Sequence, residues 1–225
     1  MPILCFCKGY LMIIGFAGKA ASGKTTAARH LASLARGETR IIPMAQALRD
    51  EVESFLRRAG ASEHVPLVYG DQDDKVRVFY IDTVRAGAAC DRWPHFVQTH
   101  GDIQDRTGMT AVTVRRLLQW WGTEYRRAQD PDYWTKAWER QLAGYDLDRV
   151  HVLVDDVRFM NEIEVIGRHG GRFVRIIRPG VAAAGNHASE ISLDGFADWD
   201  EEILNDGTLD DFLVQVARLQ QRYRL

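Results

Sequence analysis

The sequence is poor in cysteine and proline and contains no long apolar run. Cysteine contributes 3 of the 225 residues and proline contributes 6. Because Cys5 and Cys7 lie near the start and Cys90 stands alone, the sequence predicts no disulfide framework and favours a reducing cytoplasm. No apolar segment reaches the ~18 residues that a membrane-spanning helix needs. Neither a disulfide-stapled domain nor a helical membrane protein is therefore expected.

The chain also lacks an excess of charge of one sign. It has 29 Lys and Arg residues against 31 Asp and Glu residues, which gives a net charge of −2. Without a basic field over the whole molecule, nucleic acid is not expected as the main partner, although a local groove can still be basic. The length suits one α/β domain, residues 1–225, with small insertions. Residues 1–11 carry no clear pattern and are expected to be an extension.

The strongest positive feature is a phosphate-binding motif at residues 18–25, which read G-K-A-A-S-G-K-T and fit G-x-x-x-x-G-K-[ST]. An apolar strand is predicted before it and a helix after it. In that setting the backbone N–H groups of the loop and the helix N-terminus bind phosphate. Lys24 would reach the β- and γ-phosphates, and the Thr25 hydroxyl would hold Mg²⁺. The predicted nucleotide contacts of this loop are Gly18, Ala20, Ala21, Ser22, Gly23, Lys24, Thr25 and Thr26.

Strand and helix signals alternate along the chain, which indicates a parallel sheet covered on both faces by helices. The predicted strands are residues 11–17, 40–42, 150–154, 173–177 and 202–204. The predicted helices are residues 24–36, 45–57, 112–121, 124–127, 133–145, 161–168 and 209–222. Residues 61–110 mix Asp, Gly, Arg and aromatic residues without clear periodicity, so we interpret them as an insertion or a mobile subdomain.

Two carboxylates follow the apolar strand predicted at residues 150–154. In a P-loop fold, an acidic residue at such a strand end can face Mg²⁺ and the phosphates. At least one of Asp155 and Asp156 is therefore predicted to be functional, and Asp156 is our candidate metal ligand beside Thr25. The alternative is a pair of turn residues that cap the next element.

Arg158 lies just beyond these carboxylates, where it could meet an anionic ligand above the sheet edge. The alternative is a surface ion pair with Glu162, four residues later, which would contribute only ~0.3–0.5 kcal/mol. We favour the ligand-binding role because of the position beside the phosphate loop.

Residues 119–127 read Q-W-W-G-T-E-Y-R-R and combine aromatic, polar and guanidinium groups. Aromatic rings can stack on a base, and arginines can clamp a phosphate. An ordinary helix with core tryptophans and solvated arginines explains the composition equally well. Similarly, the Asn-Asp-Gly segment at 205–207 follows the last predicted strand, on the side where a purine base would lie, but a plain turn is the simpler interpretation.

Taken together, these motifs resemble those of the phage deoxynucleoside monophosphate kinases, within the nucleoside monophosphate kinase group of P-loop proteins. Besides the phosphate loop, the motifs are Leu117-Leu118-Gln119-x-x-Gly122-Thr123-Glu124, Asp156-Val157-Arg158-Phe159-x-Asn161-Glu162, His187-x-Ser189-Glu190 and Asn205-Asp206-Gly207-Thr208. The likeness extends from about residue 12 to residue 222 and so covers nearly the whole predicted fold.

The resemblance implies a three-layer P-loop sandwich. Its parallel five-stranded sheet carries helices on both faces, with mobile acceptor-binding and lid segments. The acceptor-binding insertion would be residues 45–145 and the lid region residues 179–199. ATP and Mg²⁺ are implied as phosphate donor and metal, and Asn205 and Gly207 as contacts of the donor base. No arginine lies between Arg178 and Arg218, so the lid would take its charge from the end of the preceding strand.

The resemblance also assigns acceptor and catalytic residues. Arg127 holds the position, three residues after Glu124, at which the family usually has an arginine. The implied acceptor contacts are Gln119, Trp120, Gly122, Thr123, Glu124, Arg126, Arg127, Arg158 and Glu162. The implied catalytic residues are Lys24, Asp156, Arg158 and Arg127.

The predicted reaction is ATP- and Mg²⁺-dependent phosphorylation of a deoxynucleoside monophosphate to the diphosphate, in phage nucleotide metabolism and in the cytoplasm of the host. The acceptor phosphate is already anionic, so catalysis needs positioning and charge neutralisation and no general base. One alternative is a kinase for a hydroxyl acceptor, such as a nucleoside or a hydroxymethylated base in phage DNA. A P-loop ATPase or switch is a second. The acceptor base and the oligomeric state, including a homodimer, stay open, and no membrane partner is expected.

Overall fold

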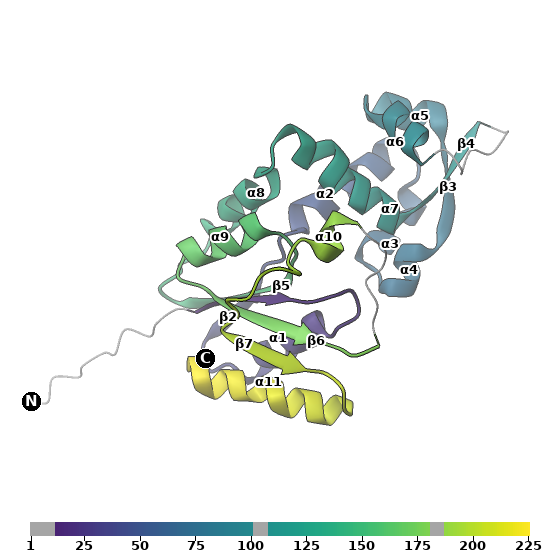
Figure 1. Ribbon diagram of the computed structural model, residues 1–225. Coiled ribbons are helices and arrows are strands. Elements are labelled where there is room, and N and C mark those ends of the chain that lie inside the picture. The colour runs from purple at the N-terminus through teal and green to yellow at the C-terminus, as the bar shows by residue number, and fades with distance from the viewer. Residues whose placement is uncertain (1–11, 101–107, 181–186) are drawn as a thin grey trace, which may run out of the picture. The chain divides into compact units, whose positions relative to one another are not determined.

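The computed structural model describes residues 12–100, 108–180 and 187–225 of the chain (Figure 1). The described chain divides into two compact units. The P-loop unit joins the residues up to Met44 to Thr135–Leu225, and the inserted unit is Ala45–Trp134. The insertion expected at residues 45–145 begins at the same residue as the inserted unit and extends further. The expected extension at residues 1–11 and part of the expected lid, residues 181–186, lie outside the described residues.

The P-loop unit is built on a five-stranded sheet in the order β2-β5-β1-β6-β7. The strands are β1 (Ile13–Ala17), β2 (Glu38–Ile41), β5 (Val150–Val157), β6 (Arg172–Ile177) and β7 (Glu201–Leu204). All four strand pairs are parallel. Every residue of the central strand β1 is buried, as expected for a parallel strand covered on both faces. The predicted parallel five-stranded sheet is confirmed.

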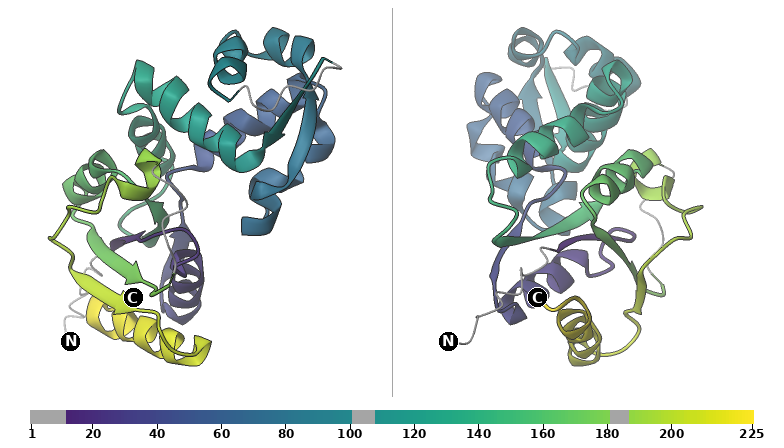
Figure 2. Two further views of the ribbon diagram at one scale, coloured as in Figure 1. Left: turned by 45° about the vertical axis from the view of Figure 1, so that its right-hand side comes forward. Right: turned by 90° about the vertical axis from the view of Figure 1, so that its left-hand side faces the viewer.

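Helices cover both faces of this sheet and form the outer two of three layers. They are α1 (Lys24–Leu34), α8 (Tyr133–Leu142), α9 (Met160–Arg168) and α11 (Leu209–Tyr223). On one face, Leu31 of α1 and Phe212 of α11 pack on Phe16, and Figures 1 and 2 show these two helices side by side. On the other face, Trp138 of α8 and Ile166 of α9 share a second core. The predicted α/β sandwich is therefore present.

The inserted unit has its own core and many short elements. They are α2 (Gln46–Arg58), η1 (Ser62–His64), α3 (Pro66–Tyr69), α4 (Gln72–Val76), β3 (Val78–Asp82), α5 (Thr83–Ala89), α6 (Trp93–Thr99), β4 (Met109–Thr113), α7 (Val114–Gln119) and η3 (Trp120–Arg127). β3 and β4 pair in antiparallel fashion. The helix expected from residue 112 starts later, because Thr113 ends β4 and its side chain accepts the backbone N–H of Arg116 as the N-cap of α7. In the described part of the chain, no helix is both long and apolar enough to cross a membrane.

Candidate active site

The phosphate loop connects β1 to α1, as the motif predicts. Gly18 and Gly23 have φ angles of 139° and 109°, which favour glycine. A Cβ atom on Gly18 would collide with the carbonyl oxygen of Ile176, and one on Gly23 would lie 2.9 Å from the Asn205 side chain. The two glycines therefore allow the loop to fold tightly, and helix α1 starts at Lys24. A helix N-terminus in this position favours an anion.

Lys24 is folded over its own loop. Its side chain is buried, and Nζ donates hydrogen bonds to the carbonyl oxygens of Gly18 at 2.7 Å and Lys19 at 2.6 Å. Burial lowers the pKa of Lys24 to about 7, and the nearby Arg158 charge acts in the same direction. A triphosphate would compete with these carbonyls for the same ammonium group and would favour its charged form.

Thr25 and Asp155 are neighbours at the start of α1. Thr25 Oγ1 donates to Asp155 Oδ2 at 2.6 Å, whereas Asp156 Oδ1 accepts the backbone N–H of Met44 at 2.7 Å. The structure therefore places Asp155, rather than the expected Asp156, beside the Thr25 hydroxyl. A hydroxyl and a carboxylate suit Mg²⁺, which usually takes one or two carboxylates and completes its shell with water and substrate phosphate. The described residues contain no cluster of three or more His, Cys, Asp or Glu side chains that could enclose a metal.

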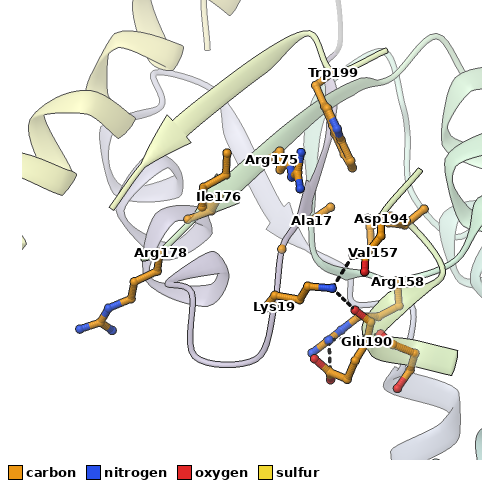
Figure 3. A pocket seen from close by; sticks show the side chains of 14 residues that line it. Ala17, Lys19, Val157, Arg158, Arg175, Ile176, Arg178, Glu190, Asp194 and Trp199 are labelled. Atoms are coloured by element: carbon orange, nitrogen blue, oxygen red, sulfur yellow. Dashed lines mark hydrogen bonds and ion pairs between the residues drawn. The ribbon is translucent and has the colours of Figure 1, made fainter. Parts of the chain in front are cut away.

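Arg158 is positioned by the short helix α10 (Ala188–Ile191), which belongs to the expected lid region. Its Nη1 donates to Glu190 Oε1 at 2.7 Å, and Glu190 Oε2 accepts the backbone N–H of Ala20 at 3.3 Å. Lys19 adds an ion pair with Asp194 (Figure 3). The carboxylate of Glu190 thus accepts hydrogen bonds from a loop amide and a guanidinium, two groups that are typical phosphate ligands.

A cavity of about 210 Å³ lies between the phosphate loop, the ends of β5 and β6, and α10 (Figure 3). Its wall includes Trp199, over which the Arg175 guanidinium lies at 5.8 Å from the ring centre. Arg178, also in the wall, donates to the carbonyl oxygen of Ala21 at 3.2 Å. The two arginines at this strand end therefore bring positive charge beside the loop, as expected for a lid poor in arginine.

The segment after β7 is tied directly to the phosphate loop. Asn205 Nδ2 donates to the carbonyl oxygen of Ser22 at 2.8 Å. Two residues later Gly207 precedes Thr208, whose side chain caps helix α11 by accepting the backbone N–H of Asp211. Asn205 is thus placed beside the loop, and its contact with a donor base stays a prediction.

A second polar cluster lies in the inserted unit around Glu51 of α2. Glu51 Oε2 accepts hydrogen bonds from Trp121 Nε1 and from Arg126 Nε, both at 2.8 Å, and Oε1 accepts one from Tyr133 at 2.5 Å. Trp121 and Arg126 come from η3, a π-helix of eight residues. Such segments are rare and often mark functional positions. Sequence inspection missed Glu51, because no local motif connects it to a partner 75 residues away.

The sequence model of the deoxynucleotide monophosphate kinase family matches residues 95–216, which is more than half of the chain. The chain belongs to this family. A protein of Acanthamoeba polyphaga mimivirus, named provisionally as a deoxynucleotide monophosphate kinase, is 26% identical over 217 residues; the match covers 92% of this chain and 94% of the viral one. The protein is thus a phosphotransferase that acts on a nucleotide, and the resemblance seen in its motifs is confirmed.

Two residues expected to contact the acceptor belong instead to the core of the kinase. Trp120 is fully buried among aromatic side chains, and its Nε1 donates to His95 Nδ1 at 3.2 Å. Gly122 is buried too: a Cβ there would lie 3.1 Å from Leu48, and its carbonyl oxygen accepts Trp134 Nε1 at 2.9 Å. The expected substrate contacts of Trp120 and Gly122 are therefore corrected to packing roles. The core-tryptophan alternative was the better interpretation for this part of the segment.

Glu162 is also a structural residue in the kinase. Its buried carboxylate accepts the backbone N–H groups of Arg158 at 2.6 Å and Phe159 at 3.1 Å, and so caps the start of α9. The expected substrate contact of Glu162 is thereby corrected. The alternative surface ion pair is corrected as well, because the guanidinium of Arg158 pairs with Glu190.

Apart from Arg158, the remaining expected acceptor residues are partly exposed in the inserted unit. They are Gln119, Thr123, Glu124, Arg126 and Arg127. Arg127 donates through Nη1 to the carbonyl oxygen of Pro131 at 3.0 Å, whereas Arg126 is held by Glu51. Their contacts with an acceptor stay predictions.

Proposed function

We propose that this kinase transfers the γ-phosphoryl group of ATP, with Mg²⁺, to a deoxynucleoside 5′-monophosphate and releases the diphosphate. The family supports this acceptor class. The observation that carries the donor half is the phosphate loop, in which Lys24 starts the helix and Thr25 adjoins the Asp155 carboxylate. That arrangement is typical of nucleoside triphosphate binding.

The donor-side residues act by position and charge. The loop amides and the N-terminus of α1 would receive the phosphates, and Lys24 would exchange its carbonyl contacts for the β- and γ-phosphates. Mg²⁺, held by Thr25 and Asp155, would neutralise charge on the phosphates. Arg158 would add a guanidinium after leaving Glu190.

The carboxylates beside the loop favour a phosphate acceptor over a hydroxyl acceptor. A hydroxyl acceptor benefits from a carboxylate that can accept its proton. Here Asp155 already accepts the Thr25 hydroxyl, and Asp156 already accepts the Met44 amide. A monophosphate oxygen is anionic near neutral pH and needs no such base.

We further propose a role in the deoxynucleotide metabolism of a virus or phage, carried out in the cytoplasm of its host. The viral source of the relative that matches over nearly the whole chain supports this setting.

The deciding experiment is a panel of acceptors with ATP and Mg²⁺. We expect at least one deoxynucleoside monophosphate to give its diphosphate, and we expect EDTA to stop the reaction. The matched acceptors are the corresponding deoxynucleosides and DNA that carries hydroxymethylated bases. Phosphorylation of only these hydroxyl acceptors, or ADP release without any phosphorylated acceptor, would overturn the proposal.

A further inference from the structure

Arg126 in the inserted unit is immobilised through only one of its nitrogens. Glu51 accepts its Nε–H at 2.8 Å, and the same carboxylate is fixed by Trp121 and Tyr133. The side chains of Arg126 and Glu51 are each 25% exposed, so this pair is largely withdrawn from solvent. A pair with this burial and several hydrogen bonds holds one geometry better than an exposed ion pair does.

The rings of two tyrosines lie against the same guanidinium. Its central carbon lies 4.5 Å from the ring centre of Tyr125 and 5.0 Å from that of Tyr133. Tyr125 in turn stacks on Trp120 at 5.5 Å and contacts Trp121 edge-on at 5.3 Å. Because these rings pack against the core of the inserted unit, the guanidinium has two ring contacts in addition to its Nε hydrogen bond.

The terminal amino groups of Arg126 are available to an anionic ligand. Neither Nη1 nor Nη2 donates a hydrogen bond to any residue within the described ranges. Arg57 of the same unit is different, because its Nε and its Nη2 both contact Glu53, at 2.9 and 2.7 Å. A planar guanidinium fork whose Nη1 and Nη2 groups donate to no described residue can donate hydrogen bonds to two oxygens of a phosphate group.

We propose that Arg126 binds the 5′-phosphate of the acceptor and that Glu51 is its positioning residue. This inference rests on the proposed function, since it assigns the phosphate subsite of the monophosphate acceptor. The phosphate is the group that all deoxynucleoside monophosphates share. This subsite would therefore bind any of them, and other residues would select the base. The structure thus gives Arg126 the role for which the motif alone favours Arg127.

The test uses four variants of the whole 225-residue chain. Arg126→Ala removes the fork, and Glu51→Ala removes its support. Glu51→Gln is the conservative rescue: its amide oxygen can accept from Arg126 and Trp121, while its NH₂ group can donate to the hydroxyl oxygen of Tyr133. Arg57→Ala is the matched control, because it removes an arginine of the same unit whose Nε and Nη2 both contact Glu53.

Three readouts are taken for every variant. The first is the KM for the accepted deoxynucleoside monophosphate together with kcat. The second is the affinity for ATP, which reports on the P-loop unit. The third is binding of deoxyribose 5-phosphate, a base-free probe, measured by tryptophan fluorescence and calorimetry. Thermal melting checks that each variant folds.

We expect Arg126→Ala to raise the acceptor KM and the dissociation constant for deoxyribose 5-phosphate roughly 10- to 100-fold, the scale of a lost charged hydrogen-bonded contact. Glu51→Ala should raise both about 10-fold, because the fork is still present but no longer held. Glu51→Gln and Arg57→Ala should stay within about threefold of the wild type. kcat and ATP affinity should change little in all four.

The outcomes separate this inference from the proposed function. If a monophosphate is phosphorylated but Arg126→Ala leaves its KM unchanged, the inference is overturned and the function stands. If no monophosphate is phosphorylated while deoxyribose 5-phosphate binds through Arg126, the function fails and the phosphate subsite stands. A parallel loss of ATP affinity and melting temperature in Glu51→Ala and Glu51→Gln would reduce Glu51 to a folding role. No binding of the probe to the wild type would overturn the subsite.

Discussion

The two units of this kinase hold their cationic groups in different ways. In the P-loop unit, Lys24 is bonded to loop carbonyls and Arg158 to Glu190. In the inserted unit, Arg126 is held by its Nε only, and within the described residues its terminal nitrogens donate no hydrogen bond. In the proposed reaction the donor side exchanges internal contacts for phosphate, whereas the proposed acceptor fork has no such contacts to give up at its terminal nitrogens.

This difference has an energetic consequence. Exchange of internal hydrogen bonds for ligand bonds lowers the net gain from each contact, because the free protein loses what it already had. A preset fork avoids that loss and binds its anion with the protein geometry unchanged. We therefore expect substitutions in the P-loop unit to act on transfer and metal use, and substitutions in the inserted unit to act on acceptor affinity.

The largest expected effect is a loss of phosphoryl transfer that leaves phosphate binding in the inserted unit unchanged. Lys24→Ala should lower kcat on the order of 10²–10³-fold, the scale for removal of one preorganised charge-stabilising group. Binding of deoxyribose 5-phosphate should be unchanged, because Arg126 and its supports are intact. Steady-state kinetics and calorimetry measure the two quantities. Equal losses in both would contradict the division between donor and acceptor sides.

The second comparison lies inside the P-loop unit and uses a matched pair of isosteric changes. Asp155→Asn should raise the Mg²⁺ concentration for half-maximal activity roughly 10- to 100-fold, the range for residues around a bound metal. Asp156→Asn keeps a carbonyl oxygen for the Met44 amide and should change the Mg²⁺ requirement much less. A Mg²⁺ titration of both variants decides the matter. A larger shift for Asp156→Asn would return the metal role to that residue.

The phosphate loop could be predicted because all its determinants are contiguous. Gly18 and Gly23 are needed for local backbone geometry, and β1 and α1 flank them directly. The choice between the two carboxylates depends on a local feature too. The apolar run suggested a strand ending at residue 154, but β5 continues to Val157. Side chains of adjacent strand residues lie on opposite faces of the sheet. Asp155 therefore contacts Thr25, whereas Asp156 contacts Met44.

The cluster around Arg126 could not be predicted in the same way. Its partner Glu51 lies on α2, and only the folded core of the inserted unit brings the two together. The described elements between them are short, with a two-stranded antiparallel pair and helices of three to seven residues. No segment is therefore long enough to show a clear hydrophobic period. The motif around Gly122-Thr123-Glu124 identified the right segment and left its side-chain roles open.

The smallest expected effect tests whether the two units respond separately to acid. His151 on β5 accepts the backbone N–H of Met12 at 3.4 Å through Nδ1, and burial lowers its pKa below the ordinary value of 6.5. The fold thus favours the neutral ring. The contribution of this ring to the free energy of unfolding is complete above pH 6.5. It is lost as the pH falls below that value toward the lower pKa of the folded state. His151→Asn, which cannot titrate but can still accept the Met12 amide, should remove this acid-side loss of stability. Urea unfolding at pH 7 and pH 5, followed by a deuterium pulse at one fixed pH, would assign the difference to peptides. It should appear in the P-loop unit and leave the inserted unit unchanged; an equal shift in both units would show that they unfold as one.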